Sequence, residues 1–123
     1  MDINELTGII LKKAYEVHTT LGPGLLESAY EECLCHELIT SGFKVERQKA
    51  IPIIYKGIKV NAGYRIDIVV NDVVVLELKS IDALAPIHTA QLITYLKLSA
   101  IKHGLLINFN VSSLKNGIKR IVV

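Results

Sequence analysis

The hydrophobic pattern opens with two amphipathic helices. Over residues 2–20, apolar side chains recur at steps of three and four residues, the spacing that places them on one face of a helix. A second helix is expected over residues 25–40, and Ser41-Gly42 ends it. Gly22-Pro23-Gly24 separates the two helices, because proline and glycine interrupt helical structure.

The pattern changes to short strands after residue 42. Runs rich in β-branched and aromatic residues alternate with turn-forming pairs, which is typical of strands joined by hairpins. Turns are expected at Lys56-Gly57 and at Asn71-Asp72. The expected strands cover residues 43–48, 50–55, 58–60, 64–70 and 73–79.

A third helix and two further strands follow. The helix is expected over residues 86–102, with Pro86 in its first turn and Gly104 as its C-terminal cap. Residues 105–108 and 118–122 predict two more strands. The order along the chain is therefore two helices, a group of strands, a helix and two strands, which indicates a mixed sheet with helices on its faces.

Composition narrows the class of protein. With 123 residues, of which 50% are hydrophobic, the chain can bury a core of its own and is not a disordered segment. We therefore predict one α/β domain over residues 1–123. No apolar run is long enough to cross a bilayer, and the acidic Asp2 and Glu5 are unlike a signal peptide. Cys33 and Cys35 diverge on a helix, so we expect reduced thiols in a cytoplasmic protein that contacts no membrane.

The charges are unevenly distributed, although the net charge is only +2. Residues 1–42 carry seven acidic side chains against two basic ones, whereas residues 43–123 carry five acidic against twelve basic ones. A basic second region suits a partner that bears phosphates, such as a nucleic acid. Solvated lysines explain the same imbalance, so the charge alone does not decide between them.

Three charged residues interrupt the two most strand-like runs. Asp67 lies in the first run, and Glu77 and Lys79 lie two residues apart, and therefore on one face, in the second. Burying an unpaired charge is costly, so such residues need partners or a metal. Two carboxylates beside a lysine can hold a divalent cation and activate water, which suits hydrolysis of a phosphodiester.

Such a metal site requires an irregular hairpin. If Asn71-Asp72 is a strict two-residue turn, Val70 pairs with Val73, and Asp67 and Glu77 face opposite sides of the sheet. A three-residue loop, or one bulge, pairs Asp67 with Glu77 instead. The metal-site hypothesis therefore predicts that irregularity.

The alternative interpretation is an ion-pair cluster without chemistry. Glu77 and Lys79 would then face water at a strand edge, and Asp67 would pair with Arg65 or with a lysine. The spacing of these residues alone does not decide between the two interpretations.

The spacing also resembles a known signature. Asp67, nine intervening residues and Glu77-Leu78-Lys79 are similar to the motif of the PD-(D/E)XK nuclease superfamily, in which the proline is often another residue, here Ile66. Residues 18–30, with the sequence HTTLGPGLLESAY, resemble the motif of the GxxExxY family, which is placed in that superfamily. The likeness covers residues 5–122 and implies a restriction-endonuclease-like core with metal-dependent nuclease activity.

The resemblance implies roles for the signature residues. Asp67, Glu77 and the Leu78 carbonyl would hold Mg²⁺, or Mn²⁺ in its place, and Lys79 would be the catalytic lysine. Glu27 matches an acid on an early helix that would complete the metal site, directly or through water, and take part in catalysis.

The helical pattern around Glu27 agrees in part with this role. Glu27 lies near Tyr30 at the border of the apolar face, so its carboxylate can point toward the edge of the core. Glu31 and Glu32, by contrast, look merely solvated.

Four more residues are expected to contact the substrate. Gln91 and Tyr95 resemble the Q-x-x-x-Y element of the RecB-like branch, which lies near the substrate phosphates, and Gln91 is counted with the catalytic residues. His88 shares their helical stripe, and Arg65 closely precedes the signature aspartate. A core hydrogen bond for His88 or Tyr95, or a surface ion pair for Arg65, is the alternative. We expect the pocket at the sheet edge between the second and third helices.

Two functions fit these features. One is metal-dependent hydrolysis of nucleic acid, with DNA favoured; the other is a nuclease-like module that binds nucleic acid or a protein partner without cutting. A chain of this length leaves no separate recognition domain, so sequence specificity would come from a homodimer or a protein partner. An aromatic content of 6% without tryptophan argues mildly against single-strand recognition by base stacking.

Overall fold

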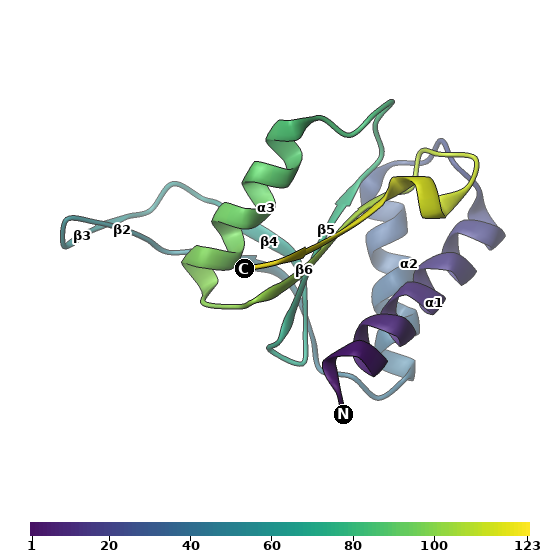
Figure 1. Cartoon of the computed structure of the whole chain (residues 1–123), viewed down its shortest axis with the longest axis horizontal. Coiled ribbons are helices and arrows are strands. Elements are labelled where there is room, and N and C mark those ends of the chain that lie inside the picture. The colour runs from purple at the N-terminus through teal and green to yellow at the C-terminus, as the bar shows by residue number, and fades with distance from the viewer.

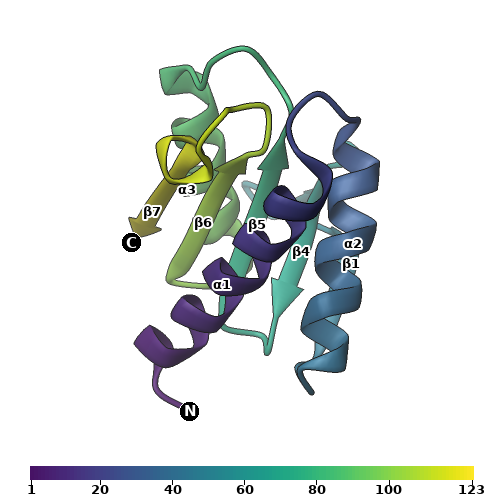
Figure 2. The same cartoon turned by 90° about the vertical axis from the view of Figure 1, so that its right-hand side faces the viewer.

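Three helices pack against the two faces of one mixed β-sheet in the computed structural model, which describes all 123 residues (Figures 1 and 2). This arrangement confirms the predicted α/β class. None of the helices has both the length and the apolar character that crossing a membrane requires. The helices are α1 (Ile3–Leu21), α2 (Glu27–Thr40) and α3 (Pro86–Ser99), with a short 3₁₀ helix η1 (Leu114–Gly117); the strands are β1 (Val45–Ala50), β2 (Ile53–Tyr55), β3 (Ile58–Val60), β4 (Arg65–Val70), β5 (Val74–Lys79), β6 (His103–Asn108) and β7 (Ile118–Val122).

The main sheet contains five of the strands in the order β1-β4-β5-β6-β7. Only β5 and β6 are parallel, and the other neighbours are antiparallel. A parallel pair needs a crossover connection, which α3 provides. The strands β2 and β3 pair only with each other and form a hairpin that leaves the body of the molecule (Figure 1).

The sheet separates two hydrophobic cores. The larger lies against α1 and α2 and contains 17 buried residues, and the smaller lies against α3 and contains 8. β5 contributes to both because its side chains alternate: Leu76 and Leu78 face the larger core and Val75 the smaller. By the same alternation, Glu77 lies on the α3 face of a strand that is otherwise apolar and buried.

The helix α3 ends earlier than the sequence predicts, and another residue caps it. It stops at Ser99, and Ala100 takes the left-handed conformation with a φ of 58°. Gly104 lies inside β6, where a Cβ atom would come within 3.0 Å of the Leu92 side chain. The predicted cap was therefore wrong, because this glycine serves the close packing of α3 on the sheet.

Both cysteines are free thiols, as predicted. Cys35 is buried in the larger core, and this burial raises the pKa of its thiol to about 11. The thiol therefore stays protonated at neutral pH and is a poor nucleophile.

Candidate active site

The loop between β4 and β5 determines which residues of the two strands face each other. The register pairs Val70 with Val74, so three residues, 71–73, form the loop. Asn71 and Asp72 have φ values of 52° and 60°, a conformation that Asn and Asp adopt more readily than most other residues. The three-residue loop that the metal-site hypothesis requires is therefore present.

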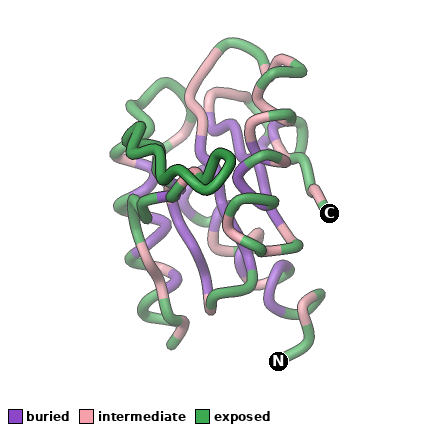
Figure 3. Tube along the Cα trace, turned by 90° about the vertical axis from the view of Figure 1, so that its left-hand side faces the viewer, coloured by how far each residue is buried: buried purple, intermediate pink, exposed green.

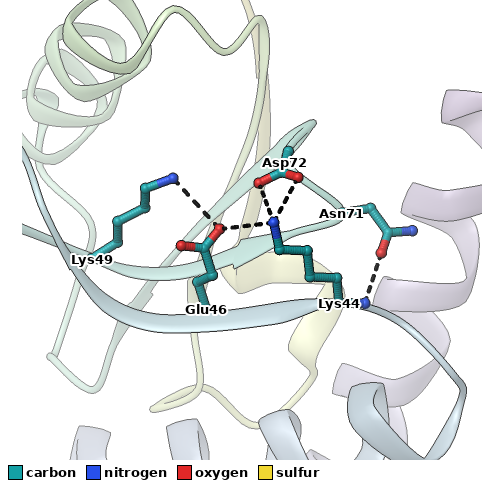
Figure 4. Close-up of polar contacts among 5 residues, drawn as sticks. All are labelled: Lys44, Glu46, Lys49, Asn71 and Asp72. Atoms are coloured by element: carbon teal, nitrogen blue, oxygen red, sulfur yellow. Dashed lines mark hydrogen bonds and ion pairs between the residues drawn. The ribbon is translucent and has the colours of Figure 1, made fainter.

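Contacts from Lys44, the residue directly before β1, hold this loop (Figure 4). The main-chain nitrogen of Lys44 donates to Asn71 Oδ1 at 2.8 Å, and its Nζ donates to both carboxylate oxygens of Asp72 at 3.0 and 3.2 Å. Lys44 Nζ also lies 3.8 Å from Glu46 Oε1, which Lys49 approaches to 3.5 Å. The hydrogen bond from Lys44 lowers the pKa of Asp72. These exposed contacts orient the loop and add little stability of their own.

The regular pairing of β4 with β5 ends at Ile68 and Leu76. The next rung of the ladder holds Asp67 and Glu77, and its hydrogen bonds are irregular. Side chains there replace main-chain acceptors: Asp67 N donates to Glu77 Oε1 at 3.1 Å, and Leu78 N donates to Asp67 Oδ2 at 2.8 Å. The fold thus brings together the two carboxylates of the sequence signature.

The side chains of β4 also stop alternating between the two faces of the sheet at this point. Ile68 and Val70 face the larger core and Val69 faces the smaller one, as in a regular strand. Ile66 departs from this pattern because it packs in the smaller core with Val69. The change falls at Asp67, whose carboxylate takes the place of a main-chain acceptor.

Glu77 is buried, whereas Asp67 is half-buried. Glu77 is only 4% exposed, and burial together with the charge of Asp67 raises its pKa to about 8. Burial also raises the pKa of Asp67, against the effect of the hydrogen bond from Leu78. A bound cation would favour the ionised form of both acids, so this pair is electrostatically suited to one.

The loop before α2 connects that helix to the end of β5. The hydroxyl of the buried Tyr30 donates to Gly22 O at 2.6 Å and accepts from Leu25 N at 3.1 Å. Ser80, directly after β5, donates to Leu25 O at 2.5 Å. The first residue of α2 is Glu27, so these bonds hold its position relative to β5. Sequence reasoning gave Tyr30 no role, although it is the tyrosine of the GxxExxY-like motif.

Glu27 and Lys79 lie within electrostatic reach of the pair. Burial raises the pKa of Glu27, the charge of Lys79 lowers it, and the charge of Asp67 raises it. No three acidic, histidine or cysteine side chains converge closely enough to hold a metal ion together. Lys79 is half-buried and forms no ion pair and no side-chain hydrogen bond with the protein.

Two residues that sequence reasoning missed support Asp67. Gln48 lies opposite it in β1 with a φ of 51°, and its Nε2 donates to Glu31 Oε1 at 2.6 Å and to Asp67 Oδ1 at 3.4 Å. Glu31 is 8% exposed, and its other oxygen accepts from Arg47 at 3.0 Å. The prediction of a solvated Glu31 was wrong because only the packing of α2 over β1 brings these partners to it. A left-handed glutamine is strained, and such strain is concentrated at functional sites.

A cleft lies between α3 and the base of the β2–β3 hairpin, and neither carboxylate is part of its lining. It has a volume of about 360 Å³, and its lining includes Gln91 and Tyr95 of α3 as well as Tyr64 at the base of the hairpin. Burial raises the pKa of Tyr95, followed by the charges of Glu77, Tyr64 and Asp67, so this wall of the cleft lies within electrostatic reach of the carboxylates. The predicted position between the second and third helices was wrong, because α2 and α3 lie on opposite faces of the sheet.

His88 and Arg65 do not enter this cleft. His88 Nδ1 accepts from Ala85 N at 2.9 Å and so caps the start of α3. Arg65 is exposed at the start of β4, where its guanidinium donates to Gln48 O at 3.4 Å.

A comparison with protein families bears on this arrangement. The profile described as the PD-(D/E)XK nuclease superfamily matches residues 4–121, which is nearly the whole chain. The chain belongs to this superfamily. The narrower likeness to the GxxExxY family rests on residues 18–30 alone. Searches of curated proteins and of solved structures gave no match.

Members of the PD-(D/E)XK superfamily typically use divalent metals, and the residues of this chain fit such an ion. Asp67 and Glu77 offer hard oxygen ligands, and both resist ionisation where no cation is near. Mg²⁺ is commonly held by one or two carboxylates, while waters and substrate phosphates complete its shell. A pair of carboxylates without a complete protein cage therefore suits Mg²⁺ or Mn²⁺.

Proposed function

We propose that this protein is a metal-dependent nuclease that hydrolyses phosphodiester bonds of nucleic acid, with DNA as the expected substrate. The observation that carries the proposal is the pairing of Asp67 and Glu77 on one interrupted rung, with Lys79 two residues further along β5. The superfamily match supports phosphodiester hydrolysis as the chemistry of this arrangement.

In this proposal Asp67, Glu77 and the Leu78 carbonyl would hold Mg²⁺ or Mn²⁺, and Glu27 would complete the site directly or through water. When bound, the ion neutralises phosphate charge and lowers the pKa of a water ligand. The hydrogen bond from Leu78 N fixes Asp67 Oδ2, while Oδ1 receives only the long contact from Gln48 and is available as a ligand.

Lys79, Gln91 and Tyr95 act on the substrate. The amine of Lys79 is not neutralised by any carboxylate within 4 Å, so it can orient the attacking water or stabilise developing negative charge. The side chains of Gln91 and Tyr95 line the cleft and have no hydrogen-bond partner within the protein, so both can bind a phosphate.

The test is a cleavage assay on the full chain with labelled DNA and RNA, in Mg²⁺, in Mn²⁺ and in EDTA. We expect cleavage with either metal and none in EDTA. Lys79→Met should cut about 10²-fold more slowly, because it removes the catalytic amine. Lys12→Met, an exposed substitution on α1, is the matched control and should cut like the native chain.

Two results would contradict the nuclease proposal. One is cleavage that persists in EDTA, and the other is equal cleavage by the Lys79→Met variant and the native chain. Metal-dependent binding of nucleic acid without any cleavage would instead support the second function, a module that binds without cutting.

A further inference from the structure

The β2–β3 hairpin, residues 52–63, forms an arm that projects from the body of the molecule (Figure 1). A hydrogen bond from Ile51 N to Tyr64 O at 2.9 Å closes its base. Lys56-Gly57 forms its tip, with φ values of 47° and 80° that are typical of a tight hairpin turn. Every residue from 54 to 65 is exposed, and in Figure 3, which views the side from which the arm projects, the arm is the green stretch in front of the buried strands.

The apolar side chains of the arm do not serve the fold. Ile54, Tyr55 and Ile58 are 63%, 60% and 64% exposed. A hairpin of two strands gains little stability by itself, and these side chains add nothing to either core. Neighbouring exposed apolar side chains of this size are typical of a contact surface.

The arm and its base carry only positive charge. No acidic residue occurs between residues 47 and 66, a stretch that contains five lysines and arginines. Lys56, Lys59 and Arg65 form no ion pair, whereas carboxylates already neutralise Arg47 and Lys49. Three unpaired cations around exposed apolar side chains are complementary to a polyanion with apolar parts.

The position of the arm relates this surface to the candidate active site. Ile53 and Tyr64, at its base, form one wall of the cleft whose other wall is α3. The rings of Tyr64 and Tyr95 lie 6.3 Å apart across that cleft. The strand β4 continues directly from the base of the arm to Asp67, only two residues beyond Arg65.

We propose that the arm enters the major groove of duplex DNA and holds the duplex beside the carboxylate pair, an inference that rests on the proposed function. A two-stranded ribbon fits that groove, which is about 12 Å wide. Lys56, Lys59 and Arg65 then contact phosphates, while Ile54 and Ile58 contact base edges such as the methyl group of thymine. Unpaired cations next to a phosphodiester-cleaving site favour DNA over an acidic protein surface.

The experiment measures binding of a fluorescent 20-base-pair duplex by anisotropy, in EDTA, over a series of salt concentrations. The arm variant is Lys56→Ala with Lys59→Ala, and the matched control is Lys115→Ala with Lys119→Ala, two exposed lysines near the opposite sheet edge. The arm variant should bind at least about tenfold more weakly, and the slope of log K against log salt should fall in magnitude by about 2. Ile54→Ser with Ile58→Ser should weaken binding without changing that slope.

Equal losses in the arm variant and the control would overturn the inference, because binding would then follow diffuse charge. An equal affinity for the duplex and for one of its strands would overturn it as well. The native chain could instead self-associate without binding the duplex, and the Ile54→Ser, Ile58→Ser variant could abolish that self-association. This result would show that the arm contacts a second copy of the chain and not DNA. Arm-dependent binding without cleavage in Mn²⁺ would contradict the nuclease proposal and leave this inference standing. Circular dichroism should show the same fold in every variant.

Discussion

The two ends of the β4–β5 hairpin differ although the same two strands form both. Near the loop, Val69 pairs with Val75 and Val70 with Val74, and all four side chains are fully buried. One rung beyond the end of this regular pairing, carboxylates take the place of main-chain acceptors, and their pKa values are raised.

The loop end of the hairpin, next to residues 71–73, serves folding. The site end, at Asp67 and Glu77, acts on the substrate in the proposed function. The loop end contributes apolar burial to both cores and sets the register. The site end buries two acids that repel each other, which lowers the stability of the metal-free protein. The loop end already fixes the register of the hairpin, so the acid pair is not needed for folding. Residues that lower stability without a role in folding are typical of a functional site.

The largest expected effect comes from exchanging one acid at the site end. Asp67→Asn keeps the acceptor for Leu78 N but removes the metal-binding charge, so cleavage should fall by about 10³-fold. Rates of metal-dependent cleavage at saturating DNA measure this change. Asp72→Asn, the same substitution at the loop end, is the control and should leave cleavage unchanged. Equal rates for the two variants would show that the ends do not differ in function.

The next effect concerns stability and its dependence on pH. Glu77 has a pKa of about 8 in the fold against 4.5 as a free side chain, so the folded state binds the extra proton between these values. Its contribution to stability is complete below pH 4.5 and is lost as the pH rises through about 8. Glu77→Gln cannot ionise and should stabilise the metal-free protein at pH 9 by on the order of 2–4 kcal/mol, with little change at pH 4.5.

Urea unfolding in EDTA at the two pH values measures this prediction. If the native protein instead became more stable than the Glu77→Gln variant as the pH rises from 4.5 to 9, Glu77 would not be held in its neutral form. Adding Mg²⁺ should reverse the order of the two proteins at high pH, because the ion stabilises the native carboxylate and not the amide.

A smaller effect is expected at the loop before α2. Tyr30→Phe keeps the stack on Phe109, whose ring centroid lies 4.4 Å away, but removes the bonds to Gly22 O and Leu25 N. We expect a loss of about 1–2 kcal/mol in unfolding free energy, together with slower cleavage as Glu27 loses its fixed position. Tyr15→Phe, whose exposed hydroxyl has no partner, should change neither quantity. An unchanged stability in Tyr30→Phe would remove this loop from the description of the site.

The periodicity of the sequence predicted the helices and most of the strands, but it left open the pairing that the site requires. A single choice, two or three residues in the loop after Val70, decides whether Asp67 faces Glu77, and the three-residue loop is known only from the structure. The fold class followed more directly, since three helical runs and a group of strand-like runs leave few ways to bury their apolar faces.

Features that depend on contacts between distant elements could not be predicted in this way. Glu31 looked solvated because its partners come from β1, and the strained Gln48 has no signal in the local sequence. Gly104 looked like a helix cap because its contact with Leu92 of α3 exists only in the packed structure. His88 shares the stripe of Gln91, yet its ring caps the start of α3.

The most direct test of the metal site is calorimetric titration of the protein with Mn²⁺. We expect one binding event in the native chain and none in the Asp67→Ala, Glu77→Ala double variant, with Asp72→Ala binding like the native chain. Absence of binding by the native chain, even with DNA present, would contradict a metal site at the interrupted rung of β4 and β5. Undiminished binding by the double variant would contradict it equally.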